Sequence, residues 1–291
     1  GTSATGRAVG HRRNASGTRR NYYLDWAGTA ASPAQGYFDG LLADGQNLGE
    51  AWAVSADGTK IFGHSPTPTT TELMPYIHDT VAGTTTALPL LPDVVSGVPY
   101  GCSADGKYAV GLLYPGVERA VLWDLRDSAP ANWTAWDLTS YFEASGMLGN
   151  FVRLSRAYSI GVDEQGNVVI TGIAIARDPE FDPQKPAALY TRAFVATLPT
   201  PPYPETGACC QVGQCGSKFP ADCQAISPSI YHKDRICANV GCPGACCDPM
   251  SGSCSDFVAS DACTAGGGTF RGASSACATS SCLGSCCKAD G

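Results

Sequence analysis

Three segments in the first part of the chain share one alternation of apolar and polar positions. In each segment an apolar run leads into a Ser-Ala-Asp-Gly or related turn, and a second apolar run ends at a glycine. The segments cover residues 51–63, 99–111 and 157–172. This pattern predicts a strand, an Asp-Gly turn and a second strand, which together form a β-hairpin.

A second pair of apolar strands is expected after each hairpin, and residues 119–123 and 192–196 belong to such pairs. Residues 7–9 resemble these segments, which places Gly1 at the position of Gly63. We therefore expect the chain to begin halfway through a repeat, without that repeat's Asp-Gly hairpin. Four short strands in every 45–60 residues or so are typical of a β-propeller blade. The pattern predicts an all-β, propeller-like domain of four-stranded units.

A proline-rich stretch at residues 197–206 divides the chain. All five tryptophans precede it, and the part that follows has few aliphatic side chains. The first part therefore has the material for a hydrophobic core, whereas the second needs covalent cross-links. We expect a repeat domain at residues 1–196, a stiff linker at 197–206, and small disulfide-stapled units after it.

Fourteen of the fifteen cysteines lie after the linker, where they form a second repeat. The first cysteine-rich repeat covers residues 207–243, the second covers 244–283, and a third begins at 284–291. The cysteines are Cys209, Cys210, Cys215, Cys223, Cys237 and Cys242, then Cys246, Cys247, Cys254, Cys263, Cys277 and Cys282, and finally Cys286 and Cys287.

Paired doublets and a single nearby histidine, His232, favour a disulfide framework over a zinc site. Disulfides persist in oxidising compartments, so we expect a secreted or cell-surface protein. Six cysteines allow fifteen pairings, and the sequence does not choose among them. Any strictly periodic scheme leaves unpaired cysteines at one or both ends. These cysteines either join neighbouring subunits, find partners in further repeats of the same gene, or pair irregularly.

The repeated Ser-Ala-Asp-Gly turn, apolar pair and glycine resemble the HAF-repeat family of secreted bacterial proteins. Arg119 and Arg192 stand where that family has histidine, and Phe194 matches its phenylalanine. The Gly-Ala-Cys-Cys segments at 207–210 and 244–247 resemble cysteine repeats near the ends of secreted proteins from planctomycete-like bacteria. Neither resemblance implies a catalytic activity.

The formal net charge of −7 argues against a nucleic-acid partner, because such proteins present a basic face. No apolar stretch is long enough to predict a membrane span. Only 15% of the residues are charged, which is typical of a turn-rich extracellular protein.

We interpret the cysteine, serine and histidine side chains of the first part of the chain as structural rather than catalytic. Cys102 lies on an apolar strand and is expected to be a buried free thiol rather than a nucleophile. Ser55 and Ser103 recur in the turns, where they cap the backbone. His78 and Asp79 form an isolated pair at a strand end. We therefore predict no catalytic residues, no cofactor and no enzymatic activity.

Two charged segments are candidate contact sites. Asp178, Glu180 and Asp182 alternate in a loop and are a weak calcium candidate against a solvated acidic loop. The predicted hairpin near the start carries four arginines that are candidate subunit contacts with a second copy of the chain. They are Arg12, Arg13, Arg19 and Arg20.

These observations favour a secreted structural protein that self-assembles into a filament or surface layer through head-to-tail contacts. The alternative is an adhesion or binding module whose propeller face recognises a cell-surface glycan or protein. The aromatic residues proposed to line that face are Tyr22, Tyr23, Trp133 and Trp136.

Overall fold

The computed structural model describes residues 1–26, 34–42, 48–114, 116–177, 188–199, 206–233, 235–280 and 282. Antiparallel sheets dominate it, which confirms the all-β prediction. The chain forms two compact units. Unit 1 contains Gly1–Thr139 and Leu148–Tyr203, and unit 2 contains Ser140–Met147 and Pro204–Gly291.

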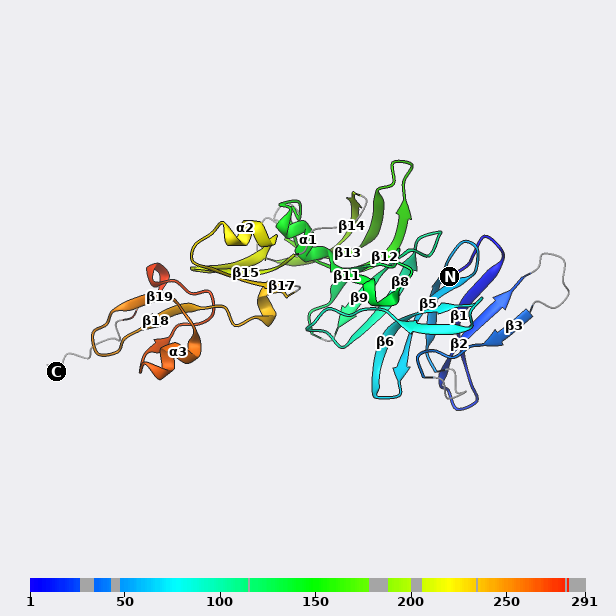
Figure 1. Ribbon diagram of the computed structural model, residues 1–291, viewed down its shortest axis with the longest axis horizontal. Coiled ribbons are helices and arrows are strands. Elements are labelled where there is room, and N and C mark those ends of the chain that lie inside the picture. Colours follow the sequence, from blue (N-terminus) through cyan, green and yellow to red (C-terminus); the bar gives the residue numbers. More distant parts are fainter. Residues whose placement is uncertain are drawn as a thin grey trace. The chain divides into compact units, whose positions relative to one another are not determined.

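Unit 1 consists of four antiparallel meanders, named sheets 1 to 4 in chain order (Figure 1). Sheet 1 contains β1 (Arg7–Arg13), β2 (Arg19–Asp25) and β3 (Ala34–Tyr37). Sheet 2 contains β4 (Glu50–Val54), β5 (Lys60–Thr67), β6 (Thr70–Asp79) and β7 (Thr84–Ala87). Sheet 3 contains β8 (Ser96–Cys102), β9 (Tyr108–Tyr114), β10 (Arg119–Asp124) and β11 (Thr134–Asp137), with the 3-10 turn η1 (Pro130–Asn132) before β11. Sheet 4 contains β12 (Phe151–Val162), β13 (Val168–Arg177) and β14 (Leu189–Leu198).

The predicted four-stranded unit is confirmed in sheets 2 and 3, whereas sheets 1 and 4 have three named strands. Consecutive sheets pack against each other and bury the apolar faces that alternation produces. Trp123, Phe62 and Val121 are fully buried in the core between sheets 2 and 3. A smaller core between sheets 1 and 2 contains Ile61 and Tyr76. Each fully buried side chain of this size contributes roughly 1.5–3 kcal/mol.

A β-bulge recurs at one position of the inner strands β4, β8 and β12. Its extra residue is Trp52 in β4, Tyr100 in β8 and Tyr158 in β12. The neighbouring strand presents a glycine beside each bulge, and these glycines close the sequence motif. They are Gly63, Gly111 and Gly172, and a Cβ atom on any of them would clash with a carbonyl oxygen of the inner strand.

The structure corrects the prediction that Gly1 occupies the position of Gly63. Gly10 pairs with Tyr22 as Gly63 pairs with Tyr76, so Gly10 is the equivalent glycine. The turn of this first repeat is formed by residues 3–6, where the Arg7 amide donates to Ser3 Oγ at 2.8 Å. The hairpin predicted to be missing is therefore present. A threonine in place of aspartate and a turn one residue shorter hid it from the alignment.

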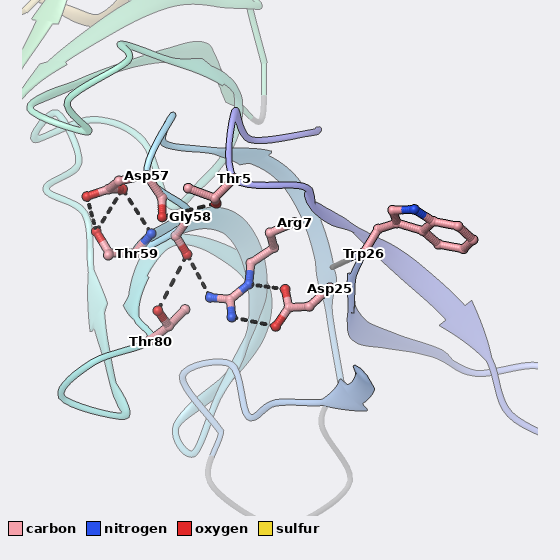
Figure 2. A pocket seen from close by; sticks show the side chains of 8 residues that line it. All are labelled: Thr5, Arg7, Asp25, Trp26, Asp57, Gly58, Thr59 and Thr80. Carbon is pink, nitrogen blue, oxygen red and sulfur yellow. Dashed lines mark hydrogen bonds and ion pairs between the residues drawn. The ribbon is translucent and has the colours of Figure 1, made fainter. Parts of the chain in front are cut away.

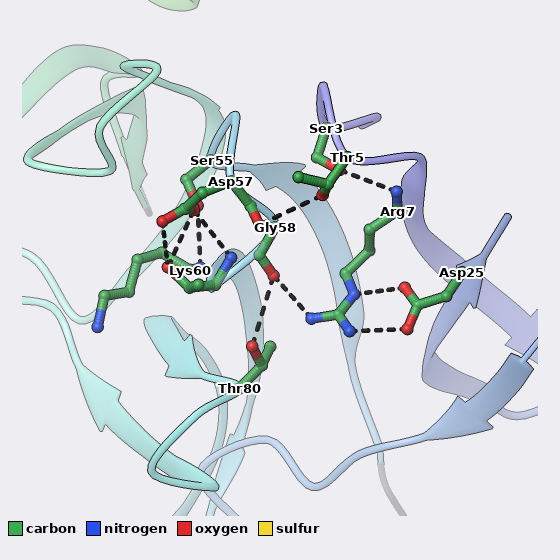
Figure 3. A network of polar contacts seen from close by, with 10 residues as sticks. Ser3, Thr5, Arg7, Asp25, Ser55, Asp57, Gly58, Lys60 and Thr80 are labelled. Atoms are coloured by element: carbon green, nitrogen blue, oxygen red, sulfur yellow. Dashed lines mark hydrogen bonds and ion pairs between the residues drawn. The ribbon is translucent and has the colours of Figure 1, made fainter. Parts of the chain in front are cut away.

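Successive turns dock on one another at one end of unit 1. The Ala4 amide donates to the Ala56 carbonyl at 2.9 Å, and the Ala56 amide donates to the Ala104 carbonyl at 2.8 Å. Gly58 has φ +77°, a conformation that favours glycine, and it lies against the preceding sheet. The Arg7 guanidinium donates to the Gly58 carbonyl at 2.7 Å, as Figure 3 shows. These bonds join sheet 1 to sheet 2 and sheet 2 to sheet 3.

Unit 2 contains two small disulfide-linked sheets. The first has β15 (Gly207–Gln211), β16 (Gln214–Lys218) and β17 (Ser229–Lys233), with α2 (Pro220–Gln224) and η2 (Cys237–Asn239). The second has β18 (Gly244–Cys247), β19 (Cys254–Val258) and β20 (Thr269–Phe270), with α3 (Ser260–Ala265) and η3 (Cys277–Thr279). The described residues form six disulfides, namely Cys209–Cys223, Cys210–Cys242, Cys215–Cys237, Cys246–Cys263, Cys247–Cys282 and Cys254–Cys277.

Pairing is the same in both repeats, and each repeat closes on itself. Equivalent cysteines make equivalent bonds, so none of the described cysteines of the first repeat is left for a covalent link to a neighbour. Cys286 and Cys287 lie outside the described residues. Such bridges stabilise units that are too small for a large core by limiting the unfolded chain.

Two boundaries differ from those expected. Strand β14 extends to Leu198, because Val168 of β13 pairs with Leu198, so the ladder continues into the predicted linker. Helix α1 (Leu138–Ala144) begins in unit 1, but its residues from Ser140 onward belong to unit 2. Its Tyr141 ring lies 6.4 Å from the Phe219 ring, edge to face. The sequence did not indicate that these residues belong to unit 2, because they directly follow the last strand of sheet 3.

We predict that Gly111→Ala destabilises unit 1 by roughly 1–3 kcal/mol, because its Cβ has no space beside the Val98 carbonyl. Gly10→Ala is the matched control. Gly10 is the equivalent residue in sheet 1, where a Cβ meets nothing within 4 Å. Urea unfolding followed by tryptophan fluorescence reports on unit 1 alone, since all five tryptophans lie there. Equal stability of the two variants would contradict the bulge argument.

Candidate functional site

Clefts between neighbouring sheets are the first candidate sites in unit 1. One, of about 350 Å³, lies between sheets 1 and 2 beside Arg7, Asp25 and Asp57 (Figure 2). The equivalent cleft between sheets 2 and 3 has about 380 Å³ and contains Lys60 and Asp79 at the same positions. The repeat therefore builds the same cleft twice.

The polar groups of these clefts hydrogen-bond one another. Arg7 donates to both carboxylate oxygens of Asp25, at 2.5 and 2.7 Å, and Lys60 donates to Asp79. The hydrogen bond from Lys60 lowers the pKa of Asp79 to about 2. Figure 2 shows the Trp26 indole directed away from the Arg7–Asp25 pair. We interpret the clefts as structural contacts, whose hydrogen bonds hold one sheet against the next.

A row of aromatic side chains along the inner strands is a stronger candidate. Trp52, Tyr100 and Tyr158 are the three bulge residues. The Trp52 and Tyr100 ring centroids are 5.4 Å apart with an interplanar angle of 88°, and those of Tyr100 and Tyr158 are 5.1 Å apart at 46°. Trp52 is 38% exposed and Tyr158 is 41% exposed. Equivalent positions of three repeats thus converge on one surface, here called the aromatic row.

A buried carboxylate stands beside the Trp52 end of this row. Glu50 is 7% exposed, and it accepts a hydrogen bond from Arg19 of sheet 1. Its carboxylate oxygens lie 3.8 Å from His11 Nδ1 and 4.0 Å from His64 Nε2. His11 and His64 are equivalent residues of consecutive repeats, since each follows the bulge-facing glycine or its counterpart.

His64 is held in its neutral form. Burial lowers the pKa of His64 to about 4, although the nearby Glu50 carboxylate favours the charged form. Its Nδ1 is buried without a hydrogen-bond partner. The His64 ring also lies 6.3 Å from the Trp52 ring, so the cluster is continuous with the aromatic row.

An arginine occupies the position of Glu50 at the other end of the row. Arg156 of β12 donates to Glu118, with an Nε to oxygen distance of 3.0 Å. The hydrogen bonds to Glu118 and then to Tyr158 raise the pKa of Arg156. Burial raises the pKa of Tyr100 in the centre of the row. The row is therefore flanked by two ion pairs, one at each end.

The outer face of sheet 4 is the second notable surface. Val195 of β14 is 73% exposed, whereas the equivalent Ile77 of sheet 2 and Leu122 of sheet 3 are 7% and 0% exposed. Thr171 is also exposed, at the position where sheets 2 and 3 bury Phe62 and Val110. This face has the residue pattern of a sheet interface but no covering sheet among the described residues.

The four candidate contact arginines divide between the two faces of sheet 1. Arg13 and Arg19 lie opposite each other in the register of the hairpin. Arg19 forms an ion pair with Glu50 of sheet 2, so Arg19 makes a contact within the subunit. Arg12 and Arg20 pair on the opposite face. There the Arg12 guanidinium lies 5.9 Å from the Tyr22 ring, and that of Arg20 lies 4.1 Å from the Tyr37 ring.

The aromatic residues expected to line a binding face are not brought together. Tyr22 lies on the outer face of sheet 1, and Tyr23 packs on the core between sheets 1 and 2. Trp133 packs on the next core and donates to the Asp127 carbonyl at 2.8 Å. Trp136 donates to Thr134 Oγ1 at 2.9 Å.

Other candidate residues have structural environments or fall outside the described ranges. Burial raises the pKa of the Cys102 thiol to about 12, as expected of a free thiol on an apolar strand. Ser55 and Ser103 donate to the aspartates of their own turns at 2.6 Å. The calcium candidates Asp178, Glu180 and Asp182 lie outside the described residues.

Two groups of three cysteine sulfurs lie close enough to suggest metal ligands. One group is Cys210, Cys215 and Cys242, and the other is Cys247, Cys254 and Cys282. All six sulfurs are in disulfides, so they offer no thiolate, and neighbouring bridges explain their proximity. Among the described helices, none has the length and apolar character required to cross a bilayer.

Comparisons with known proteins include a distant likeness to a solved structure. Neither a family model nor a curated protein matches the chain. The crystal structure of TolB from Acinetobacter baumannii is similar at 14% identity and a TM-score of 0.38, over 87% of this chain and 53% of TolB. The chain thus spans about half the length of TolB. The resemblance to HAF-repeat and planctomycete-like proteins stays a prediction.

Sequence reasoning missed the aromatic row although its signal was present. The alignment of the three repeats already placed Trp52, Tyr100 and Tyr158 in one column. An aromatic column in an apolar strand has the same pattern as core packing. Only the bulge, which the alternation pattern does not reveal, directs these side chains outward.

We predict that unit 1 loses stability as the pH falls from about 6.5 toward 4. The folded pKa of His64 lies below its ordinary value, so the neutral form stabilises the fold above that range and protonation removes the contribution. The loss amounts to as much as about 3 kcal/mol. His64→Gln should flatten this part of the profile in urea unfolding. The same pH slope in variant and wild type would contradict the assignment.

Proposed function

We propose that this chain is a non-enzymatic extracellular structural protein that assembles head to tail into a filament or surface layer. In this proposal the outer face of sheet 4 in one copy packs on the outer face of sheet 1 in the next. The observation that carries it is the 73% exposure of Val195, at a position that sheets 2 and 3 bury. The contact would extend, between molecules, the packing that joins sheets within unit 1.

Apolar exposure on a repeat structure supports this proposal. In stacked repeats each unit buries its faces against its neighbours, and terminal repeats stay soluble alone only with polar outer faces. Sheet 4 instead presents Leu189, Ala193 and Val195 on its last strand. Exposed apolar patches of this kind mark interaction surfaces.

The outer face of sheet 1 offers a different but compatible surface. It presents Gly10, Tyr22 and Tyr37 with the stems of Arg12 and Arg20, and Tyr22 lies 5.5 Å from Tyr37, ring to ring. Such residues combine large contact area with cationic groups at the rim. Because the two faces differ, the contact is heterologous, and heterologous contacts generate rings or filaments.

The disulfides support the extracellular part of the proposal. Six bridges in a small unit are typical of proteins exposed to an oxidising environment. Because both described repeats close on themselves, the bridges stabilise each subunit, and we assign the subunit contact to noncovalent packing of unit 1.

A second candidate function is an extracellular binding or adhesion module. The aromatic row favours it, since exposed tryptophan and tyrosine with arginine nearby are the residues that dominate binding surfaces. This function does not exclude assembly, because it uses the inner strands rather than the outer sheet faces.

We predict that Val195→Asp weakens self-association by roughly 100-fold or more, because the packed face would bury an unpaired carboxylate. Val81→Asp is the matched control, since Val81 is 82% exposed in the turn between β6 and β7. Sedimentation velocity over a concentration series measures the association. A wild-type chain that stays monomeric throughout, or equal weakening by both substitutions, would overturn the proposal.

A further inference from the structure

We propose that the aromatic row of Trp52, Tyr100 and Tyr158 binds a single chain of a neutral glycan. The row contains none of the residues of the proposed assembly faces. Its three residues come from strands β4, β8 and β12, which are far apart in the sequence. Three features carry the proposal, namely its repeated construction, its small size and the pairing of its flanking charges.

The construction of the row distinguishes it from incidental exposure. A β-bulge adds a residue that leaves the regular ladder and re-aims its side chain, and bulges recur beside functional sites. Here the extra residue is aromatic in every one of the three described inner strands. Unit 1 buries Trp123 completely, so it has core space for tryptophan, yet Trp52 remains 38% exposed.

The size of the row favours a small ligand over a folded protein. A stable protein interface buries about 800 Å² on each partner. Three rings in contact, of which the most exposed shows 41% of its surface, offer much less. Aromatic faces pack well against the C–H faces of sugar rings, and the centroid separations of 5.4 and 5.1 Å are close to the length of one pyranose residue.

The inclination of the rings favours one glycan chain over a flat polysaccharide surface. Adjacent rings meet at 88° and 46°, so the row has no common plane on which a crystalline sheet of sugar chains would lie. A single chain can rotate about its glycosidic bonds and follow such a surface.

The charges beside the row favour a neutral ligand. Glu50 is paired with Arg19, and Arg156 is paired with Glu118, so neither end presents an excess of one sign. The net charge of −7 also opposes polyanions. At the Tyr158 end of the row, the Arg156 and Glu118 side chains are 35% and 36% exposed. Their guanidinium and carboxylate groups can therefore donate to and accept from hydroxyls, which suits a ligand rich in hydroxyl groups.

The test is calorimetric titration of the full chain with cellohexaose, maltohexaose and N-acetylchitohexaose, each a neutral hexasaccharide, and with a hyaluronan hexasaccharide as the anionic comparison. At least one neutral sugar should bind, and the anionic sugar should bind more weakly. Trp52→Ala and Tyr158→Ala should each weaken binding about tenfold or more.

Trp26→Ala is the matched control, since Trp26 is 55% exposed but lies outside the row. The affinity of this variant for the neutral hexasaccharide should stay within about twofold of the wild-type value. Trp52→Phe keeps an aromatic ring and should restore much of the affinity lost in Trp52→Ala, which separates a contact from misfolding. The proposal is overturned if no neutral hexasaccharide binds the wild type, if the row variants bind unchanged, or if hyaluronan binds more tightly.

Discussion

Contact between a bulged inner strand and the glycine beside it is the constraint on which the repeat depends. Where Gly111 meets the Val98 carbonyl there is no room for a Cβ, so the two backbones approach more closely than ordinary residues allow. The same contact recurs at Gly63 and Gly172. It turns the bulge residue out of the ladder, while the preceding residue (Ala51, Pro99 or Ala157) remains buried. One backbone arrangement therefore creates both the regular packing and the exposed aromatic row.

Hydrogen bonds between the turns of neighbouring sheets are the second constraint on unit 1. The turn of sheet 2 is closed by its own Ser55 and Asp57, and backbone bonds through Ala56 tie it to the turns of sheets 1 and 3. A sheet is thus held at its turn end by polar contacts and along its faces by apolar packing. Both kinds of contact require a neighbour, which is why the outer faces of sheets 1 and 4 differ so much from the faces inside the stack.

The all-β class, the hairpins and the regular disulfide framework could be predicted from the sequence, because they follow from alternation, turn residues and cysteine spacing. The first repeat was misaligned because Thr5 replaces the turn aspartate and its hairpin is one residue shorter. Disulfide pairing required the fold, since fifteen schemes suit six cysteines. The aromatic row and the Glu50–His64 cluster were missed because they depend on bulges and on contacts between repeats, which strand periodicity does not encode.

Membership of Ser140–Met147 in unit 2 changes how the chain divides. The polypeptide passes between the two units three times: before Ser140, after Met147 and again at Tyr203. Neither unit is a continuous length of sequence, and cutting the proline-rich stretch would not yield a complete cysteine-rich unit, since Tyr141 and its helix would stay behind with the sheets. During synthesis this helix is made first and meets the rest of its unit only after the residues from Pro204 onward have followed, so the two units are coupled in time as well as in sequence.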